Sequence, residues 1–423
     1  MNQKNLYLQK INSLVLIRLT FFILKQCSSL PINLNLILQI CLLHCLSIAN
    51  IAYANTFDIE DNSSSLTLIK PIFDKDLGIF GEWRGSGVIS GFGMVQSNPV
   101  QTNKAYVADL SNAMIVVEQK KGSFGFFAQI GYYDILDIGQ PDQRIQKQTI
   151  NSFGVVPQAK INYSIDKNLT VSIGKLSALG GYESSFSYQN LNVVRGVLWS
   201  QTSSFSEGVQ IDYENEAFSA SIALTDGFYS NKFNWLGVDL SYKLSESQKI
   251  GAVWTGAISP NNYTTENTPL LKNNSQIVNL LYSQTVGRWS FDPYLQYTFV
   301  PANSSIGIPQ SAETYGVALL ANYKFTVDLD GSGTGYQKAS IPFRVEYIQS
   351  TGIPGSNAPT LLYGPGSSAL TLTLSPTIQY KKYFTRVEVS MIRLYDFSPQ
   401  LGFGNNSQNA SQFRGILELG ILY

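Results

Sequence analysis

The sequence predicts an all-β protein, a transmembrane antiparallel β-barrel of about 16 strands. Three observations lead to this prediction: strict alternation of apolar and polar residues, a charged fraction of only 14% beside 24 tyrosines and 23 phenylalanines, and connections that alternate between short and long. Alternation places successive side chains on opposite faces of a strand. Disordered chains carry more charge and fewer aromatic residues, and nucleic-acid-binding proteins carry a basic excess. We therefore expect no nucleic-acid partner.

The first 54 residues are typical of a secretory signal peptide. They contain four basic residues and no acidic residue, and an apolar run from Leu34 to Ile51 leads into Ala52-Tyr53-Ala54. This order predicts cleavage after Ala54. An N-terminal membrane anchor is the alternative, although Arg18 and Lys25 interrupt the first apolar stretch. Residues 55–82 are then interpreted as a polar periplasmic leader, with a small plug as the alternative, and residues 83–423 as the barrel.

Removal of the signal peptide also removes every cysteine and the only histidine. What remains has 25 basic residues (29 less the four in the signal) against 29 acidic residues. Disulfides, thiolate or imidazole metal sites and histidine-dependent catalysis are thereby excluded. We expect no enzymatic activity, no cofactor and no metal, although two carboxylates alone would suffice for glycoside hydrolysis.

The alternating segments have the length and face chemistry of membrane-spanning strands. In one of them Leu370, Leu372 and Leu374 share one face, and the threonines between them share the other. A spanning strand needs about 9–11 residues, and its uncharged polar face suits a wet lumen better than a sandwich core. The predicted strands are residues 84–96, 104–119, 123–134, 152–165, 168–177, 207–214, 216–226, 234–245, 248–258, 274–286, 288–300, 312–326, 339–351, 369–381, 383–396 and 412–423.

The rhythm of the connections decides the strand count. Short turns on the periplasmic side and long loops outside are the arrangement of bacterial barrels, and an even count leaves both chain ends in the periplasm. Residues 193–200 also alternate like a strand. A seventeenth strand would break the rhythm, so we place this segment inside the third long loop, residues 178–206.

The last predicted strand ends on an aromatic residue. Its one-face residues Phe413, Leu419, Ile421 and Tyr423 resemble the signal by which the outer-membrane assembly machinery recognises its substrates. Together with a cleaved signal peptide, this pattern predicts a bacterial outer-membrane location. Outer-membrane lipid, lipopolysaccharide and the assembly machinery are then the expected partners, beside small solutes.

Several short segments follow one another in an order that resembles a known family. They are Asp109–Ala113, Gly174-Lys175, Gly181-Tyr182-Glu183, Val194-Arg195-Gly196 and Ser206–Tyr213. The order resembles the OmpL-like β-barrel porins and, more distantly, the phosphate- and polyphosphate-selective porins. The resemblance covers most of residues 84–230. It implies a channel, often a homotrimer, whose third loop folds into the lumen. Phosphate porins line their path with lysine and arginine, whereas loop 178–206 has one arginine and one glutamate, so phosphate selectivity is not carried over.

Two functions fit the sequence. The first is a porin, a water-filled channel for passive diffusion of small hydrophilic solutes or ions. The second is a non-conducting surface barrel that acts as an adhesin or a structural outer-membrane protein. A sixteen-stranded barrel is wide enough to leave water inside, which favours the channel.

Strand parity locates a candidate constriction. The residues expected at or near it are Glu183, Arg195, Lys324, Arg344, Glu346, Arg386, Glu388 and Arg414. Folded inward, loop 178–206 would bring Glu183 toward a wall that carries three of the arginines, with Arg195 as an alternative partner that only holds the loop folded. Opposed charges across a narrow wet gap select ions through a transverse field. We expect weak selectivity, slightly in favour of anions at the basic wall.

Overall fold

The structure is a computed structural model that describes residues 64–68, 71–78, 81–101, 103–119, 123–264, 268–328 and 336–423. The expected signal peptide, residues 1–54, lies outside the described residues. The first part of the expected leader, residues 55–63, lies outside them too. Within the described ranges, no helix is both long and apolar enough to cross a membrane.

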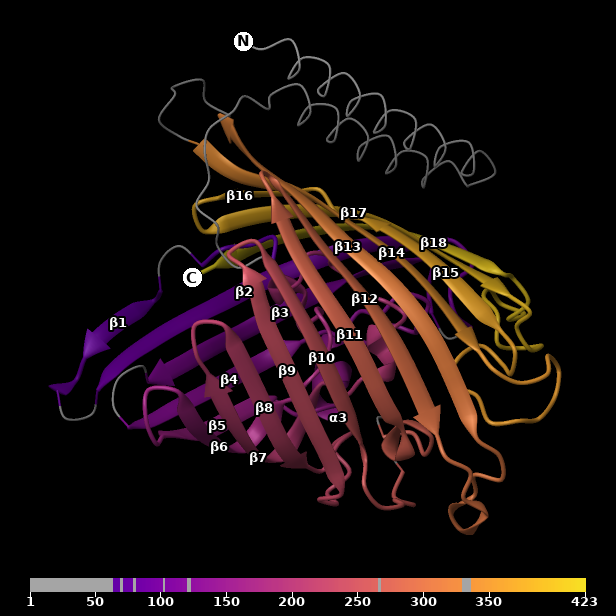
Figure 1. Cartoon of the computed structure of the whole chain (residues 1–423). Helices are drawn as coiled ribbons and strands as arrows, with labels where there is room; N and C mark the ends of the chain where they lie inside the picture. The colour runs from indigo at the N-terminus through magenta and orange to yellow at the C-terminus, as the bar shows by residue number, and fades with distance from the viewer. Residues whose placement is uncertain are drawn as a thin grey trace.

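Sixteen antiparallel strands form one closed barrel, which confirms the predicted fold class and strand count (Figure 1). The ring closes because β18 pairs with β2. Eighteen strands carry labels, since β1 pairs with β2 outside the ring and β15 and β16 are two parts of one barrel strand. The strands are β1 Phe73–Asp76, β2 Glu82–Gln96, β3 Tyr106–Gln119, β4 Phe124–Tyr133, β5 Gln158–Ser164, β6 Leu169–Ser177, β7 Phe205–Glu214, β8 Phe218–Thr225, β9 Trp235–Ser245, β10 Gln248–Ala257, β11 Gln276–Val286, β12 Trp289–Val300, β13 Ala312–Asp328, β14 Tyr336–Ser350, β15 Ser368–Leu374, β16 Thr377–Tyr380, β17 Tyr383–Tyr395 and β18 Ser411–Leu422.

Pro376 explains why one barrel strand carries two labels. Both β15 and β16 lie between β14 and β17. Proline has no backbone N–H to donate, which interrupts the ladder at Pro376. The Ser375 amide still donates to the Pro342 carbonyl, and the Pro376 carbonyl still accepts from the Val387 amide.

The two faces of the wall differ as the alternation predicts. Outward side chains are apolar and exposed: Ile161 is 53% exposed, Leu295 53% and Leu419 55%. Their inward neighbours are mostly Ser, Thr, Asn, Gln and charged residues. An apolar outer surface of this kind is what a barrel presents to lipid.

The connection between β4 and β5 differs from the prediction. The sequence assigned a strand from residue 152, whereas β5 begins at Gln158 and the short helix α3, Ile145–Asn151, precedes it. Gly154 takes a φ of +71°, which turns the chain out of the extended conformation just before the strand. The Thr149 hydroxyl bonds the backbone of Tyr133 and so fastens α3 to the end of β4.

The third long connection, residues 178–204 between β6 and β7, is called L3 below. It contacts strands on different sides of the ring: Tyr188 bonds Gln129 of β4, the Leu198 carbonyl accepts from Gln296 of β12, and the Val193 amide donates to Glu388 of β17. A segment that touches several sides of a closed ring lies within it. Residues 193–200 belong to L3 and are not a barrel strand; Arg195 makes an isolated bridge with Asp137.

Candidate functional site

L3 packs tightly against one side of the barrel interior. This side, formed by β12–β18, β2 and β3, is called the anchored wall. Val193, Val194 and Leu198 are each 0% exposed and belong to an apolar cluster with wall residues. The wall members of that cluster include Phe92, Met94, Leu320, Ile348, Ile392 and Ile416.

Two wall glutamates bind the backbone of L3. Glu388 accepts hydrogen bonds from the amides of Val193 and Val194, and Glu346 accepts from the amides of Val197 and Leu198. L3 is irregular here, so these buried amides have no partner within a helix or a ladder. Buried amides need acceptors, and a carboxylate can accept two at once. The glutamates therefore hold the loop by its main chain.

Three wall arginines bind L3 and its neighbouring loop. Arg344 donates to the Glu183 carboxylate and to the Val194 carbonyl. Arg386 donates to three L3 carbonyls, at residues 187, 190 and 191, and to Glu418 of β18. Arg414 donates to the carbonyls of residues 137 and 140 in the β4–β5 connection. The planar guanidinium suits this work because it offers five donors in a fixed fork.

Arg195 joins L3 to the β4–β5 connection. Its Nε lies 3.5 Å from Asp137 Oδ1, and its side chain is fully buried. Burial raises the pKa of Asp137, and the nearby Arg195 opposes that rise. Asp134 is also buried next to Arg195, and burial raises its pKa to about 8. The sequence analysis singled out neither aspartate: Asp137 lies in a long connection where strand parity says nothing, and Asp134 is the last residue of the predicted strand 123–134.

The geometry of the predicted constriction differs from the expected one. Arg344, Arg386 and Arg414 are 0–2% exposed and contact loop atoms directly, with no wet gap between loop and wall. Glu183 pairs with Arg344, and its side chain is 3% exposed. Arg195 is placed against Asp137 and not against Glu183 as its ion-pair partner. Lys324 lies half-buried in β13. The expected charged residues other than Lys324 thus hold L3 and the β4–β5 connection in place.

The anchor buries the carboxylate of Glu183 and changes its pKa. Its carboxylate also accepts from the Gly196 amide. Burial raises the pKa of Glu183 to about 7; Arg344 opposes the rise, and Glu346 adds to it. Two buried glutamates around one arginine leave an excess of negative charge, so a proton on Glu183 relieves it.

The opposite side of the interior remains partly exposed. This side, β5–β11, is called the open wall. Its inward residues Asn162, Gln210 and Ser221 are half-buried, and Lys243 and Lys249 are exposed. Among the described inward residues of β5–β10, three lysines stand with three carboxylates. They are Lys160, Lys243, Lys249, Asp212, Glu214 and Asp239.

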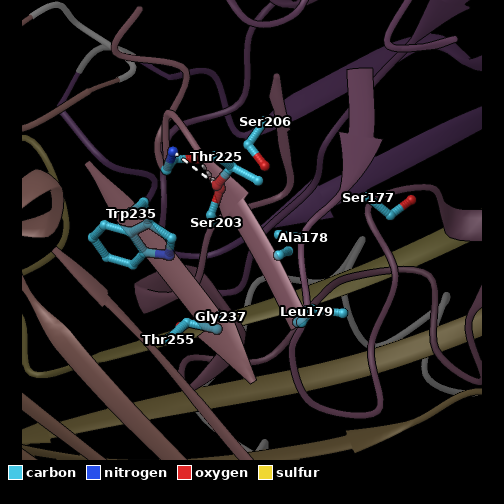
Figure 2. Close-up of a pocket in the computed structure, with 11 residues that line it drawn as sticks. Ser177, Ala178, Leu179, Ser203, Ser206, Thr225, Trp235, Gly237 and Thr255 are labelled. Atoms are coloured by element: carbon cyan, nitrogen blue, oxygen red, sulfur yellow. Dashed lines mark hydrogen bonds between the residues drawn. The ribbon is translucent and has the colours of Figure 1, made fainter. Parts of the chain in front are cut away.

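The margin of L3 approaches the open wall at a small pocket (Figure 2). Its cavity volume is ≈ 10 Å³, close to the minimum for one water molecule. Leu179, Ser203 and Ser206 border it from L3 and the start of β7, and Trp235 and Thr255 border it from β9 and β10. None of its described lining residues is charged. Within the described residues, no group of three or more His, Cys, Asp or Glu side chains could hold a metal ion.

A closed sixteen-strand barrel with a lipid-type outer face and a loop inside its lumen defines the porin class of outer-membrane protein. The family model described as "Putative beta-barrel porin-2, OmpL-like" matches residues 83–423, and the chain belongs to this family. The resemblance seen in the sequence is confirmed. Among curated proteins, none matches the chain in sequence.

Solved structures share the barrel at low sequence identity. The Salmonella typhi OmpF in complex with daunomycin is 12% identical, with a TM-score of 0.52, and the match covers 81% of this chain and 98% of that one. The outer-membrane channel DcaP of Acinetobacter baumannii is 8% identical, with a TM-score of 0.51 and coverage of 81% and 97%. OmpT of Vibrio cholerae is 10% identical, with a TM-score of 0.50 and coverage of 84% and 100%. Identities this low show a common fold.

Proposed function

We propose that this protein is a diffusion channel for small hydrophilic solutes or ions, and that its water path follows the open wall. The observation that carries the proposal is the asymmetry of the interior. L3 is fixed to the anchored wall by buried carboxylates and guanidinium groups. The partly exposed polar side chains of β5–β11 stand on the other side.

We expect weak charge selectivity. The lysines and carboxylates of the open wall balance, so the path carries no strong net sign, and rings of one sign are what make a pore selective. The slight preference for anions that we expected rested on Arg344, Arg386 and Arg414. Their charges are engaged in the anchor, so we expect no preference for anions from them.

The test is conductance of the purified, folded protein in planar bilayers, in a panel of salts and under a salt gradient. The proposal predicts discrete steps of current and a reversal potential near zero. Liposome swelling with a series of sugars then gives the size limit. A barrel that remains folded by circular dichroism but conducts nothing would contradict the channel.

The non-conducting surface barrel remains the second candidate, because the pocket between L3 and β8–β10 has room for only about one water molecule. A silent but folded barrel, present at the cell surface, is the result that this candidate predicts. Enzymatic activity is not part of either proposal. Hydrolysis of glycans or esters by the purified barrel would contradict both.

The remaining questions are the oligomeric state of the barrel and the membrane that holds it. We propose a homotrimer in the bacterial outer membrane, in contact with lipid and lipopolysaccharide, with residues 1–54 as the cleaved signal. Phe413, Leu419 and Ile421 lie on the outward face of β18 and Tyr423 follows the strand, and we propose that the assembly machinery recognises these four residues. Native electrophoresis tests the trimer, and N-terminal sequencing of the mature protein tests the cleavage site.

A further inference from the structure

A short segment of the leader lies against L3. Of residues 64–67, Leu66 is 7% exposed and belongs to an apolar cluster that joins L3 to the barrel wall. The other buried members of that cluster are Val88, Met114, Tyr133, Phe186, Phe205, Phe384 and Leu422. Leu422 and Phe384 lie at the barrel end that carries the short turns, so the segment reaches L3 from that end.

Hydrogen bonds fix this segment on both sides. Toward the wall, the Thr67 amide donates to Gln379 Oε1 over 2.8 Å, and Gln379 Nε2 donates to the Thr67 carbonyl over 2.7 Å. The Gln379 amide thus bonds both backbone groups of one residue, as a neighbouring strand would. Toward L3, the Ser64 hydroxyl donates to the Tyr188 carbonyl over 3.0 Å. These three hydrogen bonds and the buried leucine offset the conformational entropy that four ordered residues lose.

The part of L3 in contact is the turn that Arg386 also binds. Arg386 donates to the carbonyls of Ser187, Asn190 and Leu191. The Ser65 hydroxyl lies 3.4–3.5 Å from the last two of these carbonyls. The leader segment and the wall arginine therefore hold one turn of L3, residues 187–191, from two directions.

The position of the segment separates it from a plug. Its hydrogen bonds go to L3 and to β16, on the side of the anchored wall. The proposed water path follows β5–β11, on the other side of L3. The segment is therefore placed to fix L3 and not to fill the path, although the sequence left a plug open as an alternative for the leader.

We propose that residues 64–67, called the strap, set the size limit of the pore by holding turn 187–191 of L3 against the anchored wall. This rests on the proposed channel function. The strap makes the leader a determinant of which solutes pass. Loss of the strap would free the turn to move, and L3 would then fluctuate across the path.

The test compares two leucines of the leader. Leu66→Ser removes the buried anchor, and Leu68→Ser, at a residue that is 37% exposed, is the matched control. Gln379→Ala removes the clamp from the wall side without touching the leader. We expect Leu66→Ser and Gln379→Ala to make current fluctuations more frequent, on the order of tenfold. We also expect both to admit larger sugars in liposome swelling, while Leu68→Ser behaves as wild type.

Hydrogen exchange separates failure of the strap from failure of the channel. The amides of residues 187–191 should exchange faster in both strap variants and not in Leu68→Ser. Unchanged exchange and an unchanged size limit in a conducting protein would overturn the strap. A wild-type barrel that conducts nothing would overturn the channel and the size limit together, and the exchange rates would still show whether the strap holds L3. If Leu66→Ser fails to fold, the exchange rates and the size limit of Gln379→Ala decide whether the strap holds L3.

Discussion

The anchored wall and the open wall are built from the same alternating pattern but use their inward charges differently. On the anchored wall, Arg344, Glu346, Arg386 and Glu388 are all 0% exposed and bind the backbone of L3. On the open wall, Lys243 and Lys249 are exposed. A charge counts for stability where water is excluded and for conduction where water remains. The inward orientation of a charged side chain alone does not show whether it contributes to stability or to conduction.

The largest expected effect comes from breaking a buried ion pair. Arg344→Met would leave Glu183 and Glu346 buried without their guanidinium partner, which costs about 3–5 kcal/mol of unfolding free energy. Lys249→Met on the open wall should change stability by no more than about 0.5 kcal/mol. Urea unfolding followed by tryptophan fluorescence measures both. Equal losses in the two variants would remove the distinction between the walls.

A second prediction compares two glycines of L3. A Cβ at Gly196 would lie 2.0 Å from Glu346 Oε1, whereas a Cβ at Gly181 would meet only Tyr294 Cε2, at 3.9 Å. The Glu346 carboxylate is held by L3 amides and cannot move aside freely. Gly196→Ala should therefore cost about 1–3 kcal/mol, and Gly181→Ala close to nothing, in the same unfolding assay. A harmless Gly196→Ala would mean that L3 is held loosely.

The third prediction concerns pH. The pKa of Glu183 is about 7 in the folded protein, raised by burial above the ordinary value of 4.5. The folded state therefore binds a proton that the unfolded state has released, and the stability this group contributes is full below pH 4.5 and lost as pH rises through 7. Arg344, Glu346 and Arg195 are the charged groups that face it.

Glu183→Gln should flatten this dependence, by roughly 1–3 kcal/mol between pH 5 and pH 8. Glu246→Gln, at an exposed turn residue, is the control. Unfolding midpoints across that pH range give the comparison. A stability that rises with pH in wild type, or an unchanged slope in Glu183→Gln, would contradict the assignment.

Substitutions on the open wall should have the smallest effect on stability but should change the ion selectivity of the pore. Replacing Lys243 and Lys249 together by Gln leaves one lysine against three carboxylates along the described part of β5–β10. The reversal potential in a salt gradient should then shift toward cations, with stability within about 0.5 kcal/mol of wild type. Arg393→Gln, at an exposed residue of β17, should leave the reversal potential unchanged. A shift in the control variant alone would place the path elsewhere.

The sequence by itself determined the barrel. Period-two alternation is local, so each segment, such as residues 369–381, shows which of its residues share a face. The alternation of short and long connections predicted sixteen strands and excluded residues 193–200 from the ring. Parity also showed that Arg344, Glu346, Arg386 and Glu388 point inward. The mistaken start of β5 has a local cause as well, because Phe153, Val155 and Val156 have the composition of a strand but Gly154 turns the chain.

Only the tertiary structure decided what the inward charges do. Glu183 meets Arg344 across 161 residues of chain, and the Ser64 hydroxyl meets the Tyr188 carbonyl across 124. Such contacts depend on the path of an irregular loop inside a closed ring, and no repeating pattern encodes that path. Whether a carboxylate faces water or a buried amide follows from where L3 lies. The sequence therefore identified several inward-facing charged residues, and the position of the folded loop decided which of them became buried anchors.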